Sequence, residues 1–149
     1  MRIDKQGIRK LIPHAGNMCL LDEVLIWTQK SIECSTHTHL DKDNPLRFNN
    51  QLQSLSLIEY GAQAMAIHGG LLAQEHNRNY KPGYLAAIRQ ARFPIDNLEN
   101  VTDEIRIVAE AQVQLDNGVV YNFTVSSEDL GLLAEGRATV IHLGEEHIK

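Results

Sequence analysis

The sequence is poor in cysteine, has no excess of positive charge and contains no repeated segment. Its 149 residues include two cysteines, Cys19 and Cys34, without CxxC spacing, which argues against a disulfide framework and favours a reducing compartment. We expect both to behave as small buried hydrophobic residues. The formal net charge of −5 argues against a large basic surface for nucleic acid. Without a linker or a low-complexity tract, residues 1–149 are expected to form one domain.

The sequence also lacks a convincing signal peptide or membrane span. The N-terminal stretch MRIDKQGIRKLI is too polar for a secretory signal. Residues 55–73 are mostly apolar and approach the length of a span. They include Glu59, Gln63 and His68, however, and polar groups at that depth of a bilayer are costly. We therefore expect a buried helix in a cytoplasmic protein that does not enter the membrane.

The spacing of apolar residues predicts the order of the secondary-structure elements. A short helix is expected over residues 2–11, strands over 18–28 and 31–39, and a long helix over 54–74. Four further strands follow over 84–93, 104–115, 119–127 and 132–143, with Asn117-Gly118 as a hairpin turn. A helix that is apolar nearly all round needs a surface that covers it on several sides. We therefore predict an α+β fold of the hotdog type, with a long central helix wrapped by a curved antiparallel sheet.

Three motifs carry a resemblance to a known family. They are LIPHAGNMCLLDEV at residues 11–24, LIEYGAQ at 57–63 and GYLAAIRQARFPI at 83–95. Taken together and in this order, they resemble the hotdog-fold dehydratases that act on 3-hydroxyacyl chains carried by acyl carrier protein. The resemblance extends over nearly the whole chain. It implies removal of water from a 3-hydroxyacyl thioester to give a trans-2-enoyl thioester.

The resemblance also implies roles for individual residues. His14 would be the base that removes the C2 proton, because an imidazole titrates near neutrality. Glu59 would be the acid, because burial in an apolar helix would favour the neutral carboxyl group. Gln63 lies one turn further on the same helix face and could orient the carboxyl group or a water.

The same resemblance implies the partners of the chain. In the family the histidine and the glutamate come from opposite subunits of a dimer. We therefore expect a homodimer, or a heterodimer with another hotdog subunit. The substrate would arrive as a thioester of an acyl carrier protein. No dissociable cofactor and no metal are expected.

One region departs from the family pattern. Members usually carry a Pro-Gly-His-Phe-Pro element and a Met-Pro-Gly turn before the catalytic helix, whereas residues 44–59 read NPLRFNNQLQSLSLIE. Ser54 stands where the turn glycine would fall. Ser54 and Leu55 would supply backbone N–H groups to the thioester carbonyl at this helix start, as the resemblance implies. The variation resembles a subgroup of dehydratase-like proteins from aryl-polyene pathways, in which two different hotdog chains can pair.

Several alternatives compete with this interpretation. From spacing alone, His14 could be a loop histidine bonded to the backbone, and Glu59 could close a capping box that begins at Ser56. At the level of function, the chain could be a non-catalytic hotdog subunit that supports an active dehydratase. It could also be a hotdog acyl thioesterase, because one fold can host several chemistries.

The remaining polar residues carry weaker signals. His37 and His39, with Asp41 nearby, could share a metal, but a solvated strand face is the simpler interpretation because no third imidazole is close in sequence. His68 is expected to be a core histidine with satisfied hydrogen bonds. A local enrichment in basic residues could meet an acidic carrier protein or belong to an ordinary mixed-charge surface; it comprises Arg78, Lys81, Arg89 and Arg92.

Overall fold

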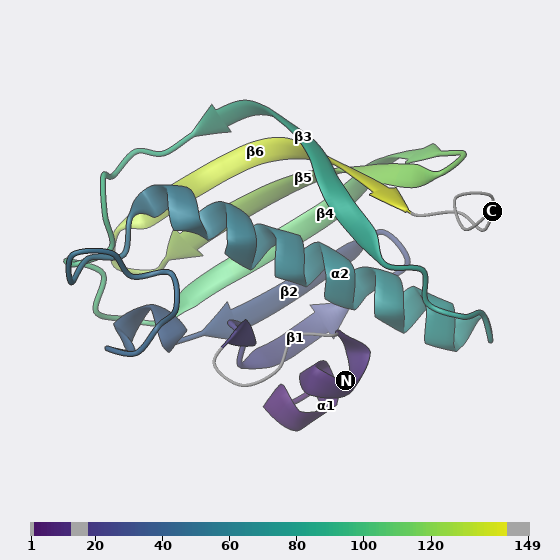
Figure 1. Cartoon of the computed structure of the whole chain (residues 1–149), viewed down its shortest axis with the longest axis horizontal. Helices are drawn as coiled ribbons and strands as arrows, with labels where there is room; N and C mark the ends of the chain where they lie inside the picture. The colour runs from purple at the N-terminus through teal and green to yellow at the C-terminus, as the bar shows by residue number, and fades with distance from the viewer. Residues whose placement is uncertain (1, 13–17, 143–149) are drawn as a thin grey trace.

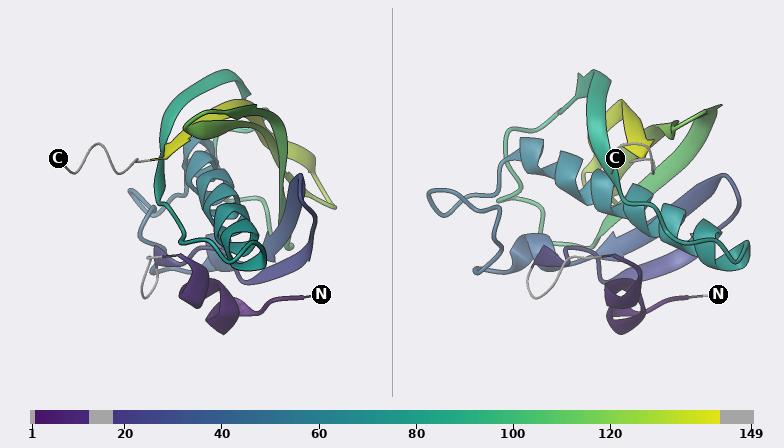
Figure 2. Two further views of the ribbon diagram at one scale, coloured as in Figure 1. Left: turned by 90° about the vertical axis from the view of Figure 1, so that its right-hand side faces the viewer. Right: turned by 45° about the vertical axis from the view of Figure 1, so that its right-hand side comes forward.

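The computed structural model describes residues 2–12 and 18–142, and its main feature is one long helix held by a curved sheet. The helix α2 (Leu57–Glu75) lies along the concave face of a six-stranded antiparallel sheet (Figure 1). Seen along α2, the strands form an arch around it (Figure 2). The predicted α+β hotdog fold is confirmed. In the described residues, no helix is long and apolar enough to cross a membrane.

The elements follow in the predicted order. A short helix α1 (Lys5–Leu11) precedes β1 (Glu23–Trp27) and β2 (Ser31–Thr36). After α2 come β3 (Gly83–Arg92), β4 (Ile105–Leu115), β5 (Gly118–Ser127) and β6 (Gly131–His142). In space the strands are ordered β1-β2-β4-β5-β6-β3.

Two predicted strands are shorter than the sequence pattern suggested. The strand expected from residue 18 begins only at Glu23, and the strand expected to reach residue 39 ends at Thr36. Thr38–Leu40 form a 3₁₀ turn instead, so the prediction of His37 and His39 on one strand face was wrong. The physical reason is that the backbone groups just before the first strand and just after the second bond to side chains instead of to a neighbouring strand.

The core lies between α2 and the concave face of the sheet. Phe123 of β5 is 1% exposed and fills the space between two glycines. A Cβ atom at Gly61 of α2 would lie 2.9 Å from its ring, and one at Gly136 of β6 would lie 3.0 Å from it. The two glycines therefore let the helix and the sheet approach each other around one large aromatic side chain.

The two buried cysteines agree with the prediction made for them. Cys19 and Cys34 are both free thiols, at 1% and 0% exposure. Burial, with a smaller contribution from the nearby Glu33 carboxylate, raises the pKa of Cys34 to about 12. Such a thiol is almost entirely protonated at neutral pH and is a poor nucleophile.

The two edges of the sheet differ. At β1, the backbone of Ile3 exchanges hydrogen bonds with Val24 and partly covers the edge. At the other end, β3 pairs with β6 and has no further strand beside it in the described part of the chain. Seven of its ten residues are exposed, and Gln90 has a φ of 55° at an irregularity in the pairing. A long exposed edge of this kind can pair with a strand of another chain.

Candidate active site

The first turn of α2 places Glu59 on the uncovered side of the helix. The carboxylate is exposed, whereas its neighbour Tyr60 is buried against the sheet. The apolar sequence around Glu59 predicted a buried carboxyl group, and for the single chain this prediction was wrong. The sheet covers only the inner face of α2, so a second body would have to supply the missing apolar cover. The capping alternative is not formed either, because the Ser56 side chain makes no capping hydrogen bond.

At the start of the helix, one of the two backbone N–H groups predicted to bind the thioester carbonyl is already bonded to another residue. The Ser54 N–H donates to the carbonyl of Asp96 at 3.0 Å, and the Ser54 side chain is 7% exposed. The Leu55 N–H has no hydrogen-bond partner within the described residues, and the Leu55 side chain is 64% exposed. Of the two predicted donors, only the Leu55 N–H could therefore donate to a carbonyl oxygen without breaking an existing bond.

Gln63 is buried and bonds to the backbone rather than facing an open site. Its Oε1 accepts from the Leu20 N–H at 2.9 Å, and its Nε2 donates to the Met18 carbonyl at 2.6 Å. The side chain amide is 2% exposed. Gln63 therefore ties α2, one turn after Glu59, to the chain segment of residues 18–22. A direct contact with substrate stays a prediction.

Residues 18–22 are irregular in backbone but extensively bonded. The Leu20 carbonyl accepts from the hydroxyls of Thr36 and Thr38 at 2.7 and 2.6 Å. The Asp22 N–H donates to the Ser35 carbonyl at 3.1 Å. Buried peptide groups outside a sheet need such partners. Sequence reasoning missed this role of the threonines, although two hydroxyl residues at alternate positions on the buried face of a strand pattern were a usable signal.

The Asp22 carboxylate joins three elements at the end of this segment. It accepts from Lys5 Nζ of α1 at 2.9 Å and from the His37 N–H at 2.8 Å, and Thr36 adds a third bond at 3.1 Å. Burial raises its pKa, but these donors outweigh burial and hold the pKa below the ordinary 3.8. The aspartate of the first motif is therefore ionised, and its role is to hold these parts of the chain together.

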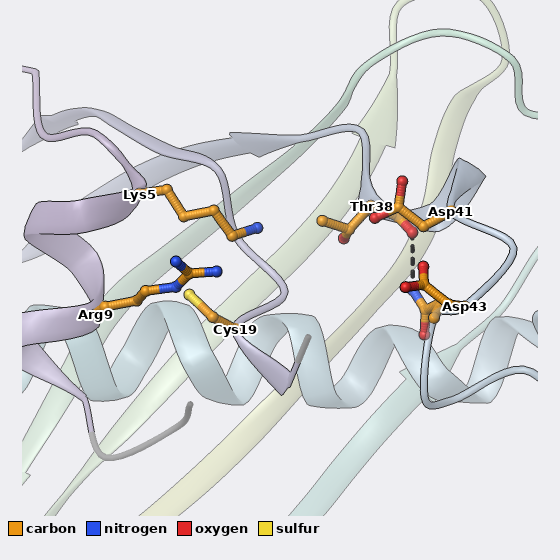
Figure 3. A pocket seen from close by; sticks show the side chains of 7 residues that line it. Lys5, Arg9, Cys19, Thr38, Asp41 and Asp43 are labelled. Atoms are coloured by element: carbon orange, nitrogen blue, oxygen red, sulfur yellow. Dashed lines mark hydrogen bonds between the residues drawn. The ribbon is translucent and has the colours of Figure 1, made fainter. Parts of the chain in front are cut away.

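A polar pocket of about 340 Å³ lies beside this segment. Lys5 and Arg9 of α1 form one wall, Asp41 and Asp43 face them, and Cys19 lies between the two walls (Figure 3). Oppositely charged walls of this kind suit hydration better than an acyl chain. Neither this pocket nor a second one, lined by Asp103, Glu104, Arg106 and residues 126–128, is an enclosed apolar tunnel.

The histidines singled out in the sequence have different outcomes in the structure. His14 lies outside the described residues, so its predicted role as base stays a prediction. His68 is fully buried, with hydrogen bonds of 2.8 Å to the Tyr121 hydroxyl and to the Thr28 carbonyl, which confirms a satisfied core histidine. His39 is 1% exposed. Backbone groups of Asp103 and Val101 face its ring, but within the described residues neither ring nitrogen makes a hydrogen bond of good geometry. In the described residues, no group of three or more histidine, cysteine, aspartate or glutamate side chains is placed to hold a metal.

The basic residues singled out in the sequence do not form one cluster of free cations. Arg92 pairs with Glu135 of β6 at 3.0 Å. Arg89 stands opposite Arg137 in the pairing of β3 with β6. The β3 end of the sheet therefore carries some surplus positive charge, and its proposed contact with an acidic carrier protein stays a prediction.

Comparisons with known proteins agree with this architecture. A model of the ApeP-like family, described as ApeP dehydratase, matches residues 6–147. No match is found among curated proteins. A chain of the dehydratase heterocomplex ApeI:P from Xenorhabdus doucetiae is 18% identical with a TM-score of 0.81, covering 95% of this chain and 93% of that chain.

Thioesterases also share the fold at lower similarity. Thioesterase superfamily member 2 from zebra fish has 17% identity and a TM-score of 0.61, over 94% of this chain and 95% of that one. A hypothetical thioesterase from Streptococcus pneumoniae, solved with coenzyme A, has 11% identity and a TM-score of 0.60, over 81% and 84% of the two chains. At these identities the solved structures establish the shared hotdog fold only.

Proposed function

Because the chain belongs to the family of ApeP-like dehydratases, we propose that it takes part in the dehydration of 3-hydroxyacyl thioesters carried on an acyl carrier protein. The product is the trans-2-enoyl thioester, in a biosynthesis of the fatty-acid, polyketide or aryl-polyene type. The observation that carries the proposal is Glu59, which stands exposed on the open face of α2 one turn from Gln63. The two free cysteines support a reducing, cytoplasmic setting for the reaction.

In the proposed reaction the base and the acid act on neighbouring carbons. His14 takes the C2 proton, and the electron pair of that C–H bond becomes the C2–C3 double bond. The C3 hydroxyl leaves with its bonding pair and takes a proton from Glu59 as water. The Leu55 N–H is a donor for the thioester carbonyl oxygen, where negative charge develops when C2 loses its proton.

A second hotdog subunit completes the proposed site. Two features of the single chain support this: Glu59 has no apolar cover, and β3 has an exposed edge. A subunit paired at β3 would extend the sheet and bring its own surface over the open side of α2. The solved relative is itself a heterocomplex, which favours a different hotdog chain over a second copy.

A specific observation favours one alternative, a non-catalytic subunit that supports an active partner. The Ser54 N–H is already bonded to Asp96, so the helix start offers fewer donors than the family pattern implies. In that case Glu59 would be dispensable, and the partner's own acid and base would carry the reaction.

The test is single-turnover mass spectrometry of 3-hydroxyacyl carrier protein, with the chain alone and mixed with purified candidate hotdog subunits. Glu59→Gln and His14→Gln should each lower the rate of water loss by about 10² to 10⁴-fold. Matched controls are Glu128→Gln in the exposed β5–β6 turn and His76→Gln at the far end of α2, which should keep full activity. Activity of the mixture that survives both site substitutions would establish the supporting-subunit role. Release of a free thiol without water loss would identify a thioesterase.

A further inference from the structure

We propose that Tyr60 is a positioning residue of the dehydratase site. Its buried hydroxyl holds the segment of residues 18–22 against the helix turn that carries Glu59. This inference rests on the proposed function and concerns a residue to which neither the motifs nor the family resemblance assigned a role.

The hydroxyl of Tyr60 belongs to a hydrogen-bond chain whose direction is fixed. Asn44 Oδ1 accepts from the Leu46 N–H at 2.9 Å, so its Nδ2 is the donor that meets the Tyr60 oxygen at 2.9 Å. Tyr60 must then donate its own proton to Thr38 Oγ1 at 3.0 Å. Thr38 in turn donates to the Leu20 carbonyl at 2.6 Å.

This chain is buried throughout. Tyr60 and Leu20 are fully buried, and Thr38 and Asn44 are 8% and 6% exposed. Burial raises the pKa of Tyr60, more than its bonds to Thr38 and Asn44 lower it, so the phenol keeps the proton that it donates. In a water-poor interior each bond polarises the next. Loss of the phenolic proton donor therefore weakens the bond between Thr38 and Leu20 as well.

The helix holds Leu20 through the two peptide units that flank its Cα atom. Gln63 accepts from the Leu20 N–H, and Tyr60 acts through Thr38 on the Leu20 carbonyl. Tyr60 and Glu59 are adjacent residues separated by about 100° around the helix axis, one directed inward and the other outward. Rotation of this helix turn would move Glu59 and would strain both contacts to Leu20. Tyr60 thus couples the placement of Glu59 to the segment that begins four residues after His14.

A second buried tyrosine supplies a matched control. Tyr121 of β5 is 3% exposed, and its hydroxyl makes one hydrogen bond of 2.8 Å, to His68 in the second half of α2. Within the described residues it makes no hydrogen bond to residues 18–22. Tyr121→Phe therefore removes a buried hydroxyl of the same kind from the same core without touching the proposed site.

The experiment compares Tyr60→Phe and Tyr121→Phe in the full chain, with whichever hotdog subunit is needed for activity. Hydrogen–deuterium exchange should show faster exchange at the Leu20 and Asp22 amides in Tyr60→Phe only. In steady-state kinetics with 3-hydroxyacyl carrier protein, Tyr60→Phe should lower kcat by about tenfold to 100-fold with KM unchanged. Tyr121→Phe should leave both constants at wild-type values.

A pair of substitutions at Thr38 sharpens the result. Thr38→Val removes the hydroxyl at similar volume and should reproduce the effect of Tyr60→Phe, whereas Thr38→Ser keeps the hydroxyl and should restore most of kcat. The double variant Tyr60→Phe/Thr38→Val should be no worse than either single variant, because one chain of bonds is broken once.

The outcomes separate this proposal from the proposed function. A wild-type complex that forms no enoyl product in any mixture would overturn the proposed function, and the catalytic part of this inference with it. An active wild type with unchanged Leu20 exchange in Tyr60→Phe would overturn the positioning role alone. Equal losses of kcat in Tyr60→Phe and Tyr121→Phe would also overturn it, because the effect would then be one of general stability.

Discussion

The two halves of α2 bury polar side chains that have different roles. In the second half, His68 bonds to the Tyr121 hydroxyl in the core and to the Thr28 carbonyl in the connection between β1 and β2. In the first half, Gln63 bonds directly to the Leu20 N–H and Tyr60 bonds to the Thr38 hydroxyl, which reaches the Leu20 carbonyl, while the neighbouring Glu59 faces out. The comparison teaches that buried polar side chains with satisfied hydrogen bonds can either stabilise the core or hold a functional residue in position. Which of the two they do depends on the part of the chain to which their hydrogen-bond partners belong.

The largest expected effect contrasts two glutamines of this one helix. Gln63→Ala would leave the Leu20 N–H and the Met18 carbonyl without partners, which should lower the free energy of unfolding by about 2 to 5 kcal/mol. Gln74→Ala changes an exposed residue near the helix end and should stay within about 0.5 kcal/mol of wild type. Urea denaturation measures both. Similar values for the two variants would mean that the Gln63 bonds add nothing to stability.

The glycines of the two halves should respond with opposite sign. In Gly61→Ala the new Cβ would meet the Phe123 ring at 2.9 Å, so overpacking should cost about 1 to 3 kcal/mol. In Gly69→Ala the nearest atom, on Tyr80, is at 3.4 Å, an ordinary contact, and alanine should stabilise the helix by about 0.5 to 1 kcal/mol. Thermal denaturation distinguishes the two signs. A destabilised Gly69→Ala would show that the second half is as tightly packed as the first.

The buried histidines and Asp22 should lose their contributions to the free energy of unfolding in separate pH ranges. Burial lowers the pKa of His68, and of His39 beside the first half, below the ordinary 6.5. The unfolded chain therefore binds these protons first, and stability falls as the pH drops below 6.5. The slope is at most about 1.4 kcal/mol per pH unit for each group. Asp22, with its pKa below 3.8, keeps its contribution until the pH falls below that value.

Urea denaturation at a series of pH values checks this prediction. His68→Gln should reduce the slope just below pH 6.5 and leave the acid range unchanged,. His76→Gln, at an exposed histidine of the same helix end, is the control for the loss of an imidazole as such. An unchanged slope in His68→Gln would mean that His68 does not titrate with unfolding.

The smallest effect is expected at the ion pair that joins α1 to the segment of residues 18–22, which packs beside the first half of α2. Lys5 Nζ lies 2.9 Å from Asp22, with side chains 29% and 36% exposed, so Lys5→Met should cost only about 0.5 to 1 kcal/mol. Lys10 of the same helix has no ion pair in the described residues, and Lys10→Met serves as control. The difference between the two variants should shrink in high salt, because exposed charges are screened. A difference that salt does not change would show that Lys5 acts through packing of its methylene groups instead.

Much of the fold could be predicted because periodic patterns report which side of an element is covered. The alternation along residues 105–113 and the Asn-Gly turn after Asp116 specify β4, β5 and their hairpin. His68 could be assigned to the core because it interrupts an apolar helix. The segment of residues 18–22 could not be predicted in the same way. Its apolar run resembles a strand, but its backbone partners are the side chains of Gln63, Thr36 and Thr38, which are distant in sequence.

By itself, the sequence determined the order of the elements, the apolar character of α2 and the four-residue spacing of Glu59 and Gln63 along it. These follow from local periodicity and from the geometry of a single helix. Only the tertiary structure decided that Glu59 faces out while Gln63 and Tyr60 face in. The reason is that the sheet covers one side of α2, and the direction of that cover depends on contacts between β2, β4, β5 and the helix. Long-range packing, which no local pattern encodes, therefore separated the exposed carboxylate from the buried groups that hold its helix turn in place.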